Sequence, residues 1–489
     1  MGHLAFGNEI LTNSATRLRG FALRLDSMSS RFHVIGLFVF VLPLASEGAE
    51  EELRRKAMFG AVLGEAKDGV SLKRVLAGTS AAEAGFRDGD IVFQLGKRKV
   101  DEIPSLLAAL AERRAGDRLV VGYRRGGKKD EMTVTLKEKL REKGDGYEVI
   151  YDSVTNDNFR QRTIVTRPPG AGRFPAVLFL QGGHTCFPVD DIVGRPSAFV
   201  RITQHLARNG YVTMRIERPG CGDSEGGPLR DVDFNTELAG SIEAVRALKR
   251  SDYVDPDNVL IYGFSMGGFF APLIALEEPV RGMAVYGTTA GTFFEGVTGQ
   301  RRRFLLLEGK SPAQVNRENI GHIRFWYQLA VERKTMREIL DAGSTPQAVL
   351  DQWSGDPPCV AGRNEQFYHQ VAEQNLAEAW GTVAKTPLPG SDKNEARFPR
   401  VLALLGEYDW HTTPAEGADW IVQTVNEASP DHATKVVIPE SDHFSNHVTS
   451  AKQSFDVLYG KQPRPTAPFN PAILTALLTW CDATVGRDR

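Results

Sequence analysis

The chain of 489 residues is too long for one hydrophobic core, so its length predicts two or three folded units. Its formal net charge of −2 gives no indication of a nucleic acid or an anionic membrane surface as a partner. The hydrophobic fraction of 42% is that of an ordinary globular protein. No C-x-x-C spacing and no glycine-rich nucleotide-binding pattern stands out, so we expect neither a metal nor a cofactor.

The N-terminus has the pattern of an export signal. An apolar stretch covers residues 34–44, well short of the ~20 residues that span a bilayer. Arg31 precedes it, small residues follow at 45–49, and Met28 is a plausible true start. We therefore expect a signal peptide over residues 1–49 and a periplasmic or secreted protein with no stable membrane insertion after cleavage. An uncleaved membrane anchor is the alternative.

A small β-rich module is predicted next. It comprises an alternating strand, a segment of small residues, a helix and a further strand-like segment, at 69–75, 78–92, 104–113 and 119–127. The Ser-Ala-Ala-x-Ala-Gly-x-x-x-Gly-Asp-Ile run from Ser80 to Ile91 carries a close resemblance to bacterial PDZ domains over residues 54–138.

The PDZ resemblance implies a peptide-binding role. Such domains add a peptide C-terminus as a strand to a sheet edge and hold its carboxylate with backbone amides of a short loop. By resemblance that loop includes Phe59, Gly60 and Ala61. Three leucines either line the groove or belong to the core of the module: Leu106, Leu107 and Leu110.

A charged run separates this module from the rest of the chain. It extends from Lys137 to Gly146 and is interpreted as the solvated end of the module leading into a linker over residues 139–145. A second domain is then expected over residues 146–489.

Three apolar runs in this second domain predict buried strands, at 175–180, 212–216 and 259–261. The last run leads into Gly263-Phe264-Ser265-Met266-Gly267, a G-x-S-x-G sequence between a strand and a predicted helix. This context favours a tight turn that exposes the Ser265 hydroxyl above the sheet, because glycines on both sides of the serine permit the bend.

A serine nucleophile needs a base and an acid to orient the base. The apolar run 401–406 delivers Asp409, and the short strand 435–439 is followed by His443. Glu407 is the alternative acid, and His411 and His447 are the alternative bases. Asp442 is adjacent to His443, so we expect it to point elsewhere, at a turn or on the surface.

A long insertion lies between a strand at 282–287 and the strand at 401. It covers about residues 290–398, too long for a structureless loop, with helices expected at 320–339 and 365–380. Four aromatic residues either pack in the core of the insertion or line a substrate pocket: Phe325, Trp326, Tyr327 and Trp380.

Together these segments resemble the α/β-hydrolase superfamily, closest to its dienelactone-hydrolase-like and prolyl-oligopeptidase-like branches. Four segments carry the resemblance: Asp255–Asn258, the G-x-S-x-G turn, Gly406–Asp409 and Ser441–Phe444. It implies a mostly parallel eight-stranded sheet, with the insertion as a helical cap over the serine.

The same resemblance assigns roles to individual residues. Ser265, Asp409 and His443 correspond to the catalytic triad, and the backbone amides of Met266 and Gly183 to the oxyanion donors. Gln181 stands where related motifs have a histidine, and His184 is expected in a nearby loop. Cys186 and Cys221 follow strands that are neighbours in this fold, so either a disulfide or two free thiols is expected there.

The resulting hypothesis is an exported serine hydrolase that cleaves small carboxylic esters, with a PDZ domain for peptide C-termini. Two alternatives stay open. One is a peptidase of prolyl-oligopeptidase type, although no propeller-like repeat precedes the catalytic region. The other is a binding protein in which the PDZ domain carries the function and the hydrolase domain is vestigial.

Overall fold

The computed structural model describes residues 53–487 apart from 112, 188, 192–195, 356–357, 392–395 and 462–463. The predicted signal peptide at residues 1–49 lies outside this part of the chain. Within it, no helix combines the length and the apolar character needed to cross a membrane.

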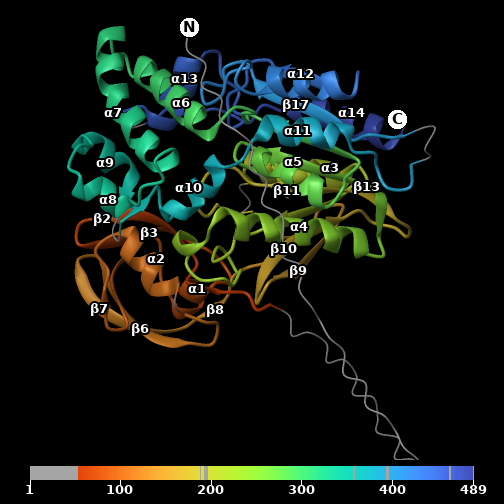
Figure 1. Cartoon of the computed structure of the whole chain (residues 1–489). Helices are drawn as coiled ribbons and strands as arrows, with labels where there is room; N and C mark the ends of the chain where they lie inside the picture. The colour runs from red at the N-terminus through yellow and green to blue at the C-terminus, as the bar shows by residue number, and fades with distance from the viewer. Residues whose placement is uncertain are drawn as a thin grey trace, which may run out of the picture. The chain divides into compact units, whose positions relative to one another are not determined.

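The N-terminal module, residues 57–138, contains a six-stranded sheet in the order β2-β3-β4-β6-β7, with β5 paired to β4 (Figure 1). Strand β1 pairs separately with β8, so the two ends of the module lie side by side. Its elements are β1 (Ala57–Met58), β2 (Ala61–Ala66), β3 (Gly69–Val75), α1 (Ser80–Ala84), β4 (Ile91–Leu95), β5 (Arg98–Lys99), α2 (Ile103–Ala111), β6 (Arg118–Arg125), β7 (Lys128–Thr135) and β8 (Lys137–Glu138).

The three leucines of α2 differ in their environment. Leu106 is fully buried in the core of the module, which corrects its assignment as a possible groove residue. Leu110 packs partly against that core, and Leu107 is exposed. Successive positions on one helix point in different directions, so spacing alone could not separate these roles.

The α/β domain, residues 146–487, is built on an eight-stranded sheet in the order β18-β17-β14-β13-β11-β12-β10-β9. The strands from β18 to β12 in this order run parallel to one another. Strand β10 is antiparallel to both of its neighbours, β12 and β9. The strands are β9 (Glu148–Asn156), β10 (Phe159–Arg167), β11 (Phe174–Leu180), β12 (Val212–Ile216), β13 (Val254–Phe264), β14 (Gly282–Tyr286), β17 (Arg400–Gly406) and β18 (Ala433–Ile438).

Apolar side chains cover both faces of this sheet, because parallel strands buried on two sides are hydrophobic throughout. One face packs against α4 (Phe234–Arg250), α5 (Gly267–Glu277) and α12 (Ala418–Ala428). The other face packs against α3 (Ala198–Arg208) and α14 (Ala472–Val485). The remaining helices outside the insertion are the 3₁₀ turn η1 (Leu229–Asp231) and α13 (Ala451–Tyr459).

The insertion between β14 and β17 forms a mainly helical segment, called the cap below (Figure 1). Two helices were expected here, but the structure has four in their place. The breaks have a local cause: Thr335 and Asn375 act as N-caps and start new helices. The cap comprises α6 (Phe293–Leu307), α7 (Pro312–Ala330), α8 (Met336–Asp341), α9 (Gln347–Trp353), β15 (Ser354–Gly355), β16 (Cys359–Val360), α10 (Glu365–Ala372) and α11 (Leu376–Lys385).

Three of the four cap aromatics have a packing role. Phe325, Trp326 and Trp380 are almost completely buried in the core shared by the cap and the sheet. Tyr327 is exposed on the surface of α7.

The segment predicted to be a solvated linker is instead held to the α/β domain by buried ion pairs. Glu142 bonds to Arg215 of β12 at 2.8 Å, and both side chains are buried. Lys139 reaches Asp190 at 3.2 Å. Lys139 and Glu142 have buried partners that are distant in sequence, so the sequence alone could not show this attachment. Glu138, Lys143 and Asp145 are exposed, as expected of a solvated run.

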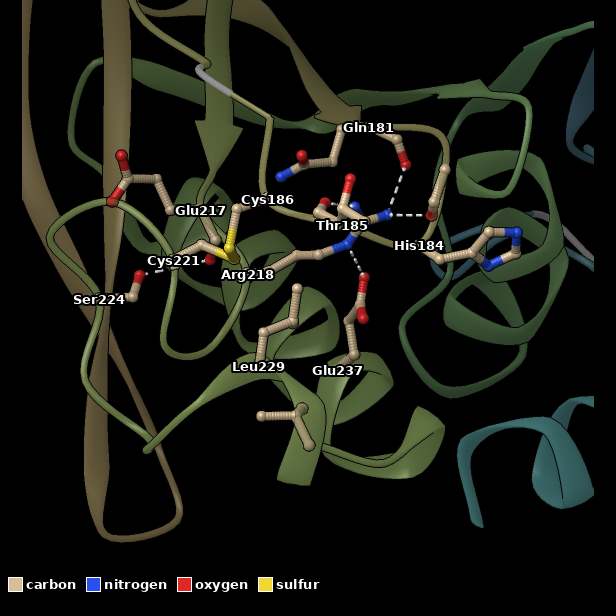
Figure 2. The surroundings of a disulfide bond; sticks show 12 residues. Gln181, His184, Thr185, Cys186, Glu217, Arg218, Cys221, Ser224, Leu229 and Glu237 are labelled. Atoms are coloured by element: carbon tan, nitrogen blue, oxygen red, sulfur yellow. Dashed lines mark hydrogen bonds and ion pairs between the residues drawn. A yellow bond between two sulfur atoms is a disulfide. The ribbon is translucent and has the colours of Figure 1, made fainter. Parts of the chain in front are cut away.

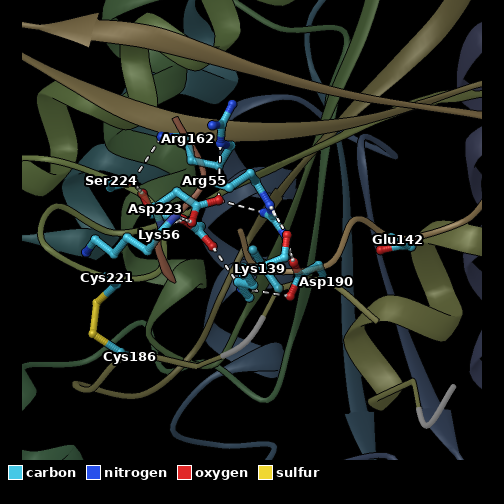
Figure 3. Close-up of polar contacts among 12 residues, drawn as sticks. Arg55, Lys56, Lys139, Glu142, Arg162, Cys186, Asp190, Cys221, Asp223 and Ser224 are labelled. Carbon is cyan, nitrogen blue, oxygen red and sulfur yellow. Dashed lines mark hydrogen bonds and ion pairs between the residues drawn. A yellow bond between two sulfur atoms is a disulfide. The ribbon is translucent and has the colours of Figure 1, made fainter. Parts of the chain in front are cut away.

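The chain entering the module is anchored at the same place (Figure 3). Arg55 pairs with Asp223 at 2.6 Å and with Asp190 at 3.2 Å, and all three side chains are buried. Its guanidinium also lies over the ring of Tyr151, 4.2 Å from the ring centroid. Both ends of the N-terminal module are therefore attached to the loops that follow β11 and β12.

Glu217, at the end of β12, makes the stability of this region pH-dependent. Burial raises its pKa to about 7, opposed by the nearby charge of Lys139. Because this folded-state pKa lies above the unfolded value, the contribution of Glu217 to the free energy of unfolding is fully present below pH ~4.5. It is lost as the pH rises from there through 7. With 1.36 kcal/mol per pKa unit, the expected loss is about 3 kcal/mol.

Urea unfolding at pH 5 and pH 8 measures this effect. From pH 5 to pH 8, the free energy of unfolding of the unmodified protein should fall by about 3 kcal/mol more than that of Glu217→Gln. The glutamine retains an acceptor but does not titrate. An equal pH dependence of the two proteins would show that Glu217 titrates normally.

Candidate active site

Ser265 occupies the turn between β13 and α5 in a strained backbone conformation. Its φ of +51° lies in the left-handed region that residues other than glycine rarely adopt. The flanking glycines are required by close contacts. A Cβ on Gly263 would lie 2.6 Å from the carbonyl oxygen of Gly267, and one on Gly267 would lie 2.3 Å from that of Leu180. The turn therefore has the geometry that the G-x-S-x-G pattern predicts.

A continuous chain of hydrogen bonds joins Ser265, His443 and Asp409. Nε2 of His443 lies 3.1 Å from Oγ of Ser265, and Nδ1 of His443 lies 2.8 Å from Oδ2 of Asp409. His443 and the side chain of Asp409 are buried. The structure thus brings together the nucleophile, base and acid proposed from the sequence, in an order suited to proton transfer from the serine.

Asp409 is held rigidly at the end of β17. Its Oδ1 accepts hydrogen bonds from the backbone amides of His411 and Thr412, at 2.8 and 3.2 Å. Burial on its own would raise the pKa of Asp409, but the interactions with His443 and these amides bring the pKa below its ordinary value. The Asp409 carboxylate is therefore ionised at every pH at which a protonated His443 needs a counter-charge.

The alternative acid and bases lie in other environments. The Glu407 carboxylate accepts from the backbone amide of Glu440 at 2.9 Å. His447 is exposed, with its Nδ1 3.9 Å from a carboxylate oxygen of Glu440. His411 stacks on the ring of His443, with centroids 4.3 Å apart and planes 18° from parallel. Burial, followed by the charge of His443, lowers the pKa of His411 well below its ordinary value, so it is neutral at pH 7.

Asp442 stands at a turn, closed by a hydrogen bond from the Ser445 amide to its carbonyl at 3.1 Å, as one of the two alternatives had it, but it is buried and not at the surface. It accepts hydrogen bonds from the amides of Phe444 and Asn446, both at 2.9 Å, and from the Ser454 hydroxyl at 2.9 Å. Tyr286 donates to its backbone carbonyl at 2.6 Å. Asp442 therefore shapes the loop that presents His443, a role that depends on four partners in three separate segments.

Asp409, His411 and His443 also form a group whose ligand atoms lie within 4.8 Å of one another, as a metal site would require. The near-parallel stacking of the two imidazoles turns their faces, and not their in-plane lone pairs, toward each other. Nδ1 of His443 is already bonded to Asp409. The donor set does not fit a metal and does fit acid–base chemistry.

Gly287, directly after β14, leaves the space that His443 and Asp409 occupy. A Cβ at this position would lie 2.7 Å from Nδ1 of His443 and 2.9 Å from Oδ2 of Asp409, and its φ is +60°. We expect Gly287→Ala to displace the imidazole and to lower kcat by about 10²-fold, because small misplacements of catalytic groups have effects of that size. Steady-state kinetics with a chromogenic ester measures this, and a kcat within threefold of the unmodified value would contradict it.

Three backbone amides near Ser265 are free to bind a developing oxyanion. Among the described residues, the N–H groups of Met266, Gly182 and Gly183 have no hydrogen-bond acceptor. Gly182 packs directly against the turn, since a Cβ there would lie 2.8 Å from Cβ of Ser265. Gly183 adopts a positive φ of +70°. The structure is consistent with Gly183 as a donor and adds Gly182 as a second candidate on the same loop.

A disulfide joins the end of this loop to the loop after β12 (Figure 2). Cys186 and Cys221 are bridged with a Cα–Cα distance of 5.5 Å, which confirms the pairing considered from the sequence. The other two cysteines, Cys359 and Cys481, are free.

Aromatic residues from the cap surround the ring of His184. Phe293 and Tyr368 lie with their ring centroids 6.2 and 5.8 Å from it. Burial, with the nearby charge of Arg218, lowers the pKa of His184 to about 4. His184 is therefore a neutral residue of the loop after β11, near the site, as its position in the sequence suggested.

Sequence reasoning missed three arginines that act on the catalytic loops. Arg218 and Arg363 bond to carbonyls of the loop after β11. Arg303 of α6 donates to the carbonyls of Trp410 and His411, at 2.6 and 2.7 Å, beside the acid. Arg218 stands in a stretch interpreted as a structural turn, and nothing in the local sequence marks the two cap arginines.

Comparison with known protein families decides the classification. The model of a family described as "Alpha/beta hydrolase family" matches residues 169–455. The chain belongs to the alpha/beta hydrolase family. A PDZ domain model matches residues 57–136, so this alpha/beta hydrolase carries an N-terminal PDZ domain.

Individual relatives of this alpha/beta hydrolase are distant. A "Probable dipeptidyl-aminopeptidase B" of Talaromyces marneffei is 29% identical over 164 residues, 31% of this chain and 18% of that protein. The chain thus spans less than a fifth of the length of that relative. Among solved structures, the alpha/beta hydrolase GrgF from Penicillium sp. sh18 is 16% identical, with a TM-score of 0.41 over 70% of this chain and 99% of that one. A hyperthermophilic esterase from Pyrobaculum calidifontis is 14% identical, with a TM-score of 0.41 over 70% and 87% of the two chains.

Proposed function

We propose that this alpha/beta hydrolase is an exported serine esterase that cleaves small carboxylic esters through an acyl-enzyme on Ser265. The observation that carries the proposal is the hydrogen-bonded chain from Ser265 through His443 to Asp409. A hydroxyl 3.1 Å from an imidazole nitrogen, with a buried carboxylate behind that imidazole, is the arrangement that activates a serine.

The reaction follows from these positions. Oγ of Ser265 attacks the ester carbonyl while Nε2 of His443 takes its proton, and the amides of Met266 and Gly183 or Gly182 bind the oxyanion. Collapse of the tetrahedral intermediate breaks the bond to the alcohol, which leaves with the proton from His443. Water then attacks the acyl-enzyme, gives a proton to His443, and releases the acid and the free Ser265 hydroxyl.

A peptidase is the second candidate, favoured by the name of the dipeptidyl-aminopeptidase relative. Since the similarity covers only 18% of that protein, its activity is not carried over as a whole. The two candidates differ in the substrate, and the same Ser265 chemistry serves both.

A substrate panel separates the candidates. Residues 51–489 are assayed with p-nitrophenyl esters of increasing chain length and with dipeptidyl and longer peptidyl p-nitroanilides. Ester turnover with kcat/KM at least about 100-fold above that for every anilide supports the esterase, and the profile against chain length gives the size of the acyl pocket. Cleavage of anilides alone would establish the peptidase, and no turnover of either by folded protein would leave the PDZ domain as the functional part.

We further propose that the PDZ domain binds a peptide C-terminus. Strand β2 lies at the end of its sheet, so an added strand can pair with its free edge. The carbonyls of Phe59 and Gly60 accept from the amides of Ala81 and Leu76, at 2.8 and 3.0 Å. The N–H groups of Phe59 and Gly60 have no acceptor within the described part of the chain, which supports this loop, with Ala61, as the carboxylate site.

Fluorescence anisotropy with a mixture of labelled peptides tests the PDZ proposal. Peptides with a free C-terminal carboxylate should bind, and the same peptides with an amidated C-terminus should not. Equal binding of the two forms would contradict a carboxylate loop at residues 58–61.

Export is supported by the disulfide as well as by the signal-like N-terminus. Disulfides such as Cys186–Cys221 form and persist in oxidising compartments. We therefore place the mature protein in the periplasm or outside the cell.

A further inference from the structure

Two buried arginines, Arg218 and Arg363, hold the loop that carries the oxyanion donors, residues 181–185, called the oxyanion loop here. Figure 2 shows Arg218 beside this loop. One Nη atom of Arg218 donates to the carbonyls of Gln181, Gly182 and Gly183, at 3.3, 3.2 and 2.9 Å. The other Nη donates to the carbonyl of Thr185 at 2.6 Å. The remaining carbonyl of the loop, on His184, accepts from Nε of Arg363 at 2.9 Å.

All five carbonyls of the loop are thus bonded to guanidinium groups. Successive carbonyls alternate in direction in an extended chain, so bringing them to two neighbouring cations requires an unusual turn. Gly183 supplies this turn with its φ of +70°. The amides of Gly182 and Gly183 are correspondingly left without acceptors among the described residues.

The arginines also act electronically on the two amides. The Gly183 N–H shares a peptide unit with the Gly182 carbonyl, and the Gly182 N–H shares one with the Gln181 carbonyl. A peptide whose carbonyl accepts from a cation is polarised, so its N–H becomes a stronger donor. Arg218 therefore strengthens the groups that face the developing negative charge.

Glu237 of α4 joins the two arginines into one unit. It accepts from Nε of Arg218 at 2.5 Å and from Arg363, and all three side chains are buried. Burial alone would raise the pKa of Glu237, but the two guanidiniums outweigh it and hold the pKa below its ordinary value. One carboxylate between two guanidiniums leaves a net positive charge behind the oxyanion loop.

Arg363 belongs to the cap, between β16 and α10, whereas Arg218 lies in the loop after β12 and Glu237 on α4. An Nη atom of Arg363 donates to the carbonyl of Val232 at 3.1 Å, and the Arg363 guanidinium lies 4.3 Å from the ring centroid of Phe367. The disulfide secures the other side: Cys221 lies three residues after Arg218 and is bridged to Cys186 at the end of the oxyanion loop. The cap and the bridge therefore support one loop conformation together.

We propose that Arg218, Glu237 and Arg363 are positioning residues for oxyanion stabilisation, and that Arg363 makes the seating of the cap a condition for it. This inference rests on the proposed serine-hydrolase function. It assigns to the cap a part in the chemical step, through its hydrogen bond to the loop.

A comparison of an oxoester with its thionoester tests this role separately from general stability. In a thionoester, sulfur replaces the carbonyl oxygen, and donors placed for an oxyanion bind the larger, weakly accepting sulfur poorly. The ratio of kcat/KM for p-nitrophenyl acetate to that for its thionoester therefore reports the oxyanion donors.

Arg363→Lys retains the charge but cannot bridge the His184 carbonyl, Glu237 and Val232 together. We expect its kcat for the oxoester to fall by about 10- to 100-fold with KM within about threefold, and the oxoester-to-thionoester ratio to fall by a similar factor. Glu237→Gln, which removes the bridging charge, should lower the same ratio and serves if the Arg363 variant does not fold.

Arg303→Lys is the matched control, because Arg303 is a cap arginine that bonds to the carbonyls of Trp410 and His411 and to the Glu416 carboxylate, and not to the oxyanion loop. Its kcat should fall while the ratio stays within about twofold of the unmodified enzyme. An unchanged ratio in folded Arg363→Lys and Glu237→Gln, or an equal decrease in Arg303→Lys, would overturn the inference. Absence of oxoester turnover by the unmodified protein would instead remove the proposed function on which it rests.

Discussion

Ser265→Ala should lower kcat for ester hydrolysis by about 10⁴- to 10⁶-fold, because no other group can form the acyl-enzyme. The replaced hydroxyl makes one hydrogen bond, 3.1 Å long, to His443. The fold should therefore be retained, with a melting temperature close to that of the unmodified protein. Steady-state kinetics with a p-nitrophenyl ester, together with thermal unfolding, measures both quantities.

Residual turnover in this variant has a defined meaning. Hydrolysis at about a tenth of the original rate or more by folded Ser265→Ala would contradict a serine nucleophile. Loss of turnover together with a lower melting temperature would require a second variant, Ser265→Cys, which keeps a nucleophile at the same position and should form an acyl-enzyme that a mass measurement detects.

Asp409→Asn should lower kcat by about 10⁴-fold, the second of the two largest effects. The asparagine side chain fits the same space but cannot stabilise the charged imidazole and can favour the wrong tautomer of His443. The stacked His411 is neutral at pH 7 and so supplies no negative charge in place of Asp409.

Glu407→Gln provides the matched control for Asp409→Asn. Glu407 follows the same strand, two residues before Asp409, and its carboxylate accepts from the amide of Glu440 at 2.9 Å. A glutamine retains an acceptor for that amide, so kcat should stay within about threefold. The reverse pattern, with a large loss in Glu407→Gln and a small one in Asp409→Asn, would transfer the role of the acid to Glu407.

The sequence was sufficient for the parallel strands of the sheet and for the turn at Ser265, but not for the antiparallel strands β9 and β10. Buried parallel strands are continuous apolar runs, and the strand at 212–216 was predicted with its observed bounds. The turn at Ser265 could be recognised because its glycines, and the strand before it, are adjacent in sequence. Local patterns of this kind can be recognised because the residues that cause the structure are neighbours in the sequence.

The residues missed from the sequence depend on contacts between distant segments. Arg218 and Arg363 are 145 positions apart, and their common role appears only when the cap places Arg363 beside Glu237. The charged run around Glu142 was misinterpreted for the same reason, since its buried partner Arg215 lies on β12. A charge shows in the sequence, but its burial and its partner are properties of the assembled fold.

Helix breaks in the cap are an intermediate case. Thr335 with Glu338 forms a capping box, and the Asn375 side chain accepts from the amide of Glu378. Both signals are present in the sequence and predict helix starts. The two expected helices nevertheless run across these starts, and four shorter helices form in their place.

The most direct test of the central claim is to map the site of covalent labelling by an alkyl fluorophosphonate. This reagent transfers its phosphonyl group to an activated serine and loses fluoride, so the protein gains the mass of one phosphonyl group. We expect a single adduct on the peptide that contains Ser265, and no adduct in His443→Ala, which lacks the base. Labelling at another residue, or no labelling of folded protein that hydrolyses esters, would contradict Ser265 as the nucleophile.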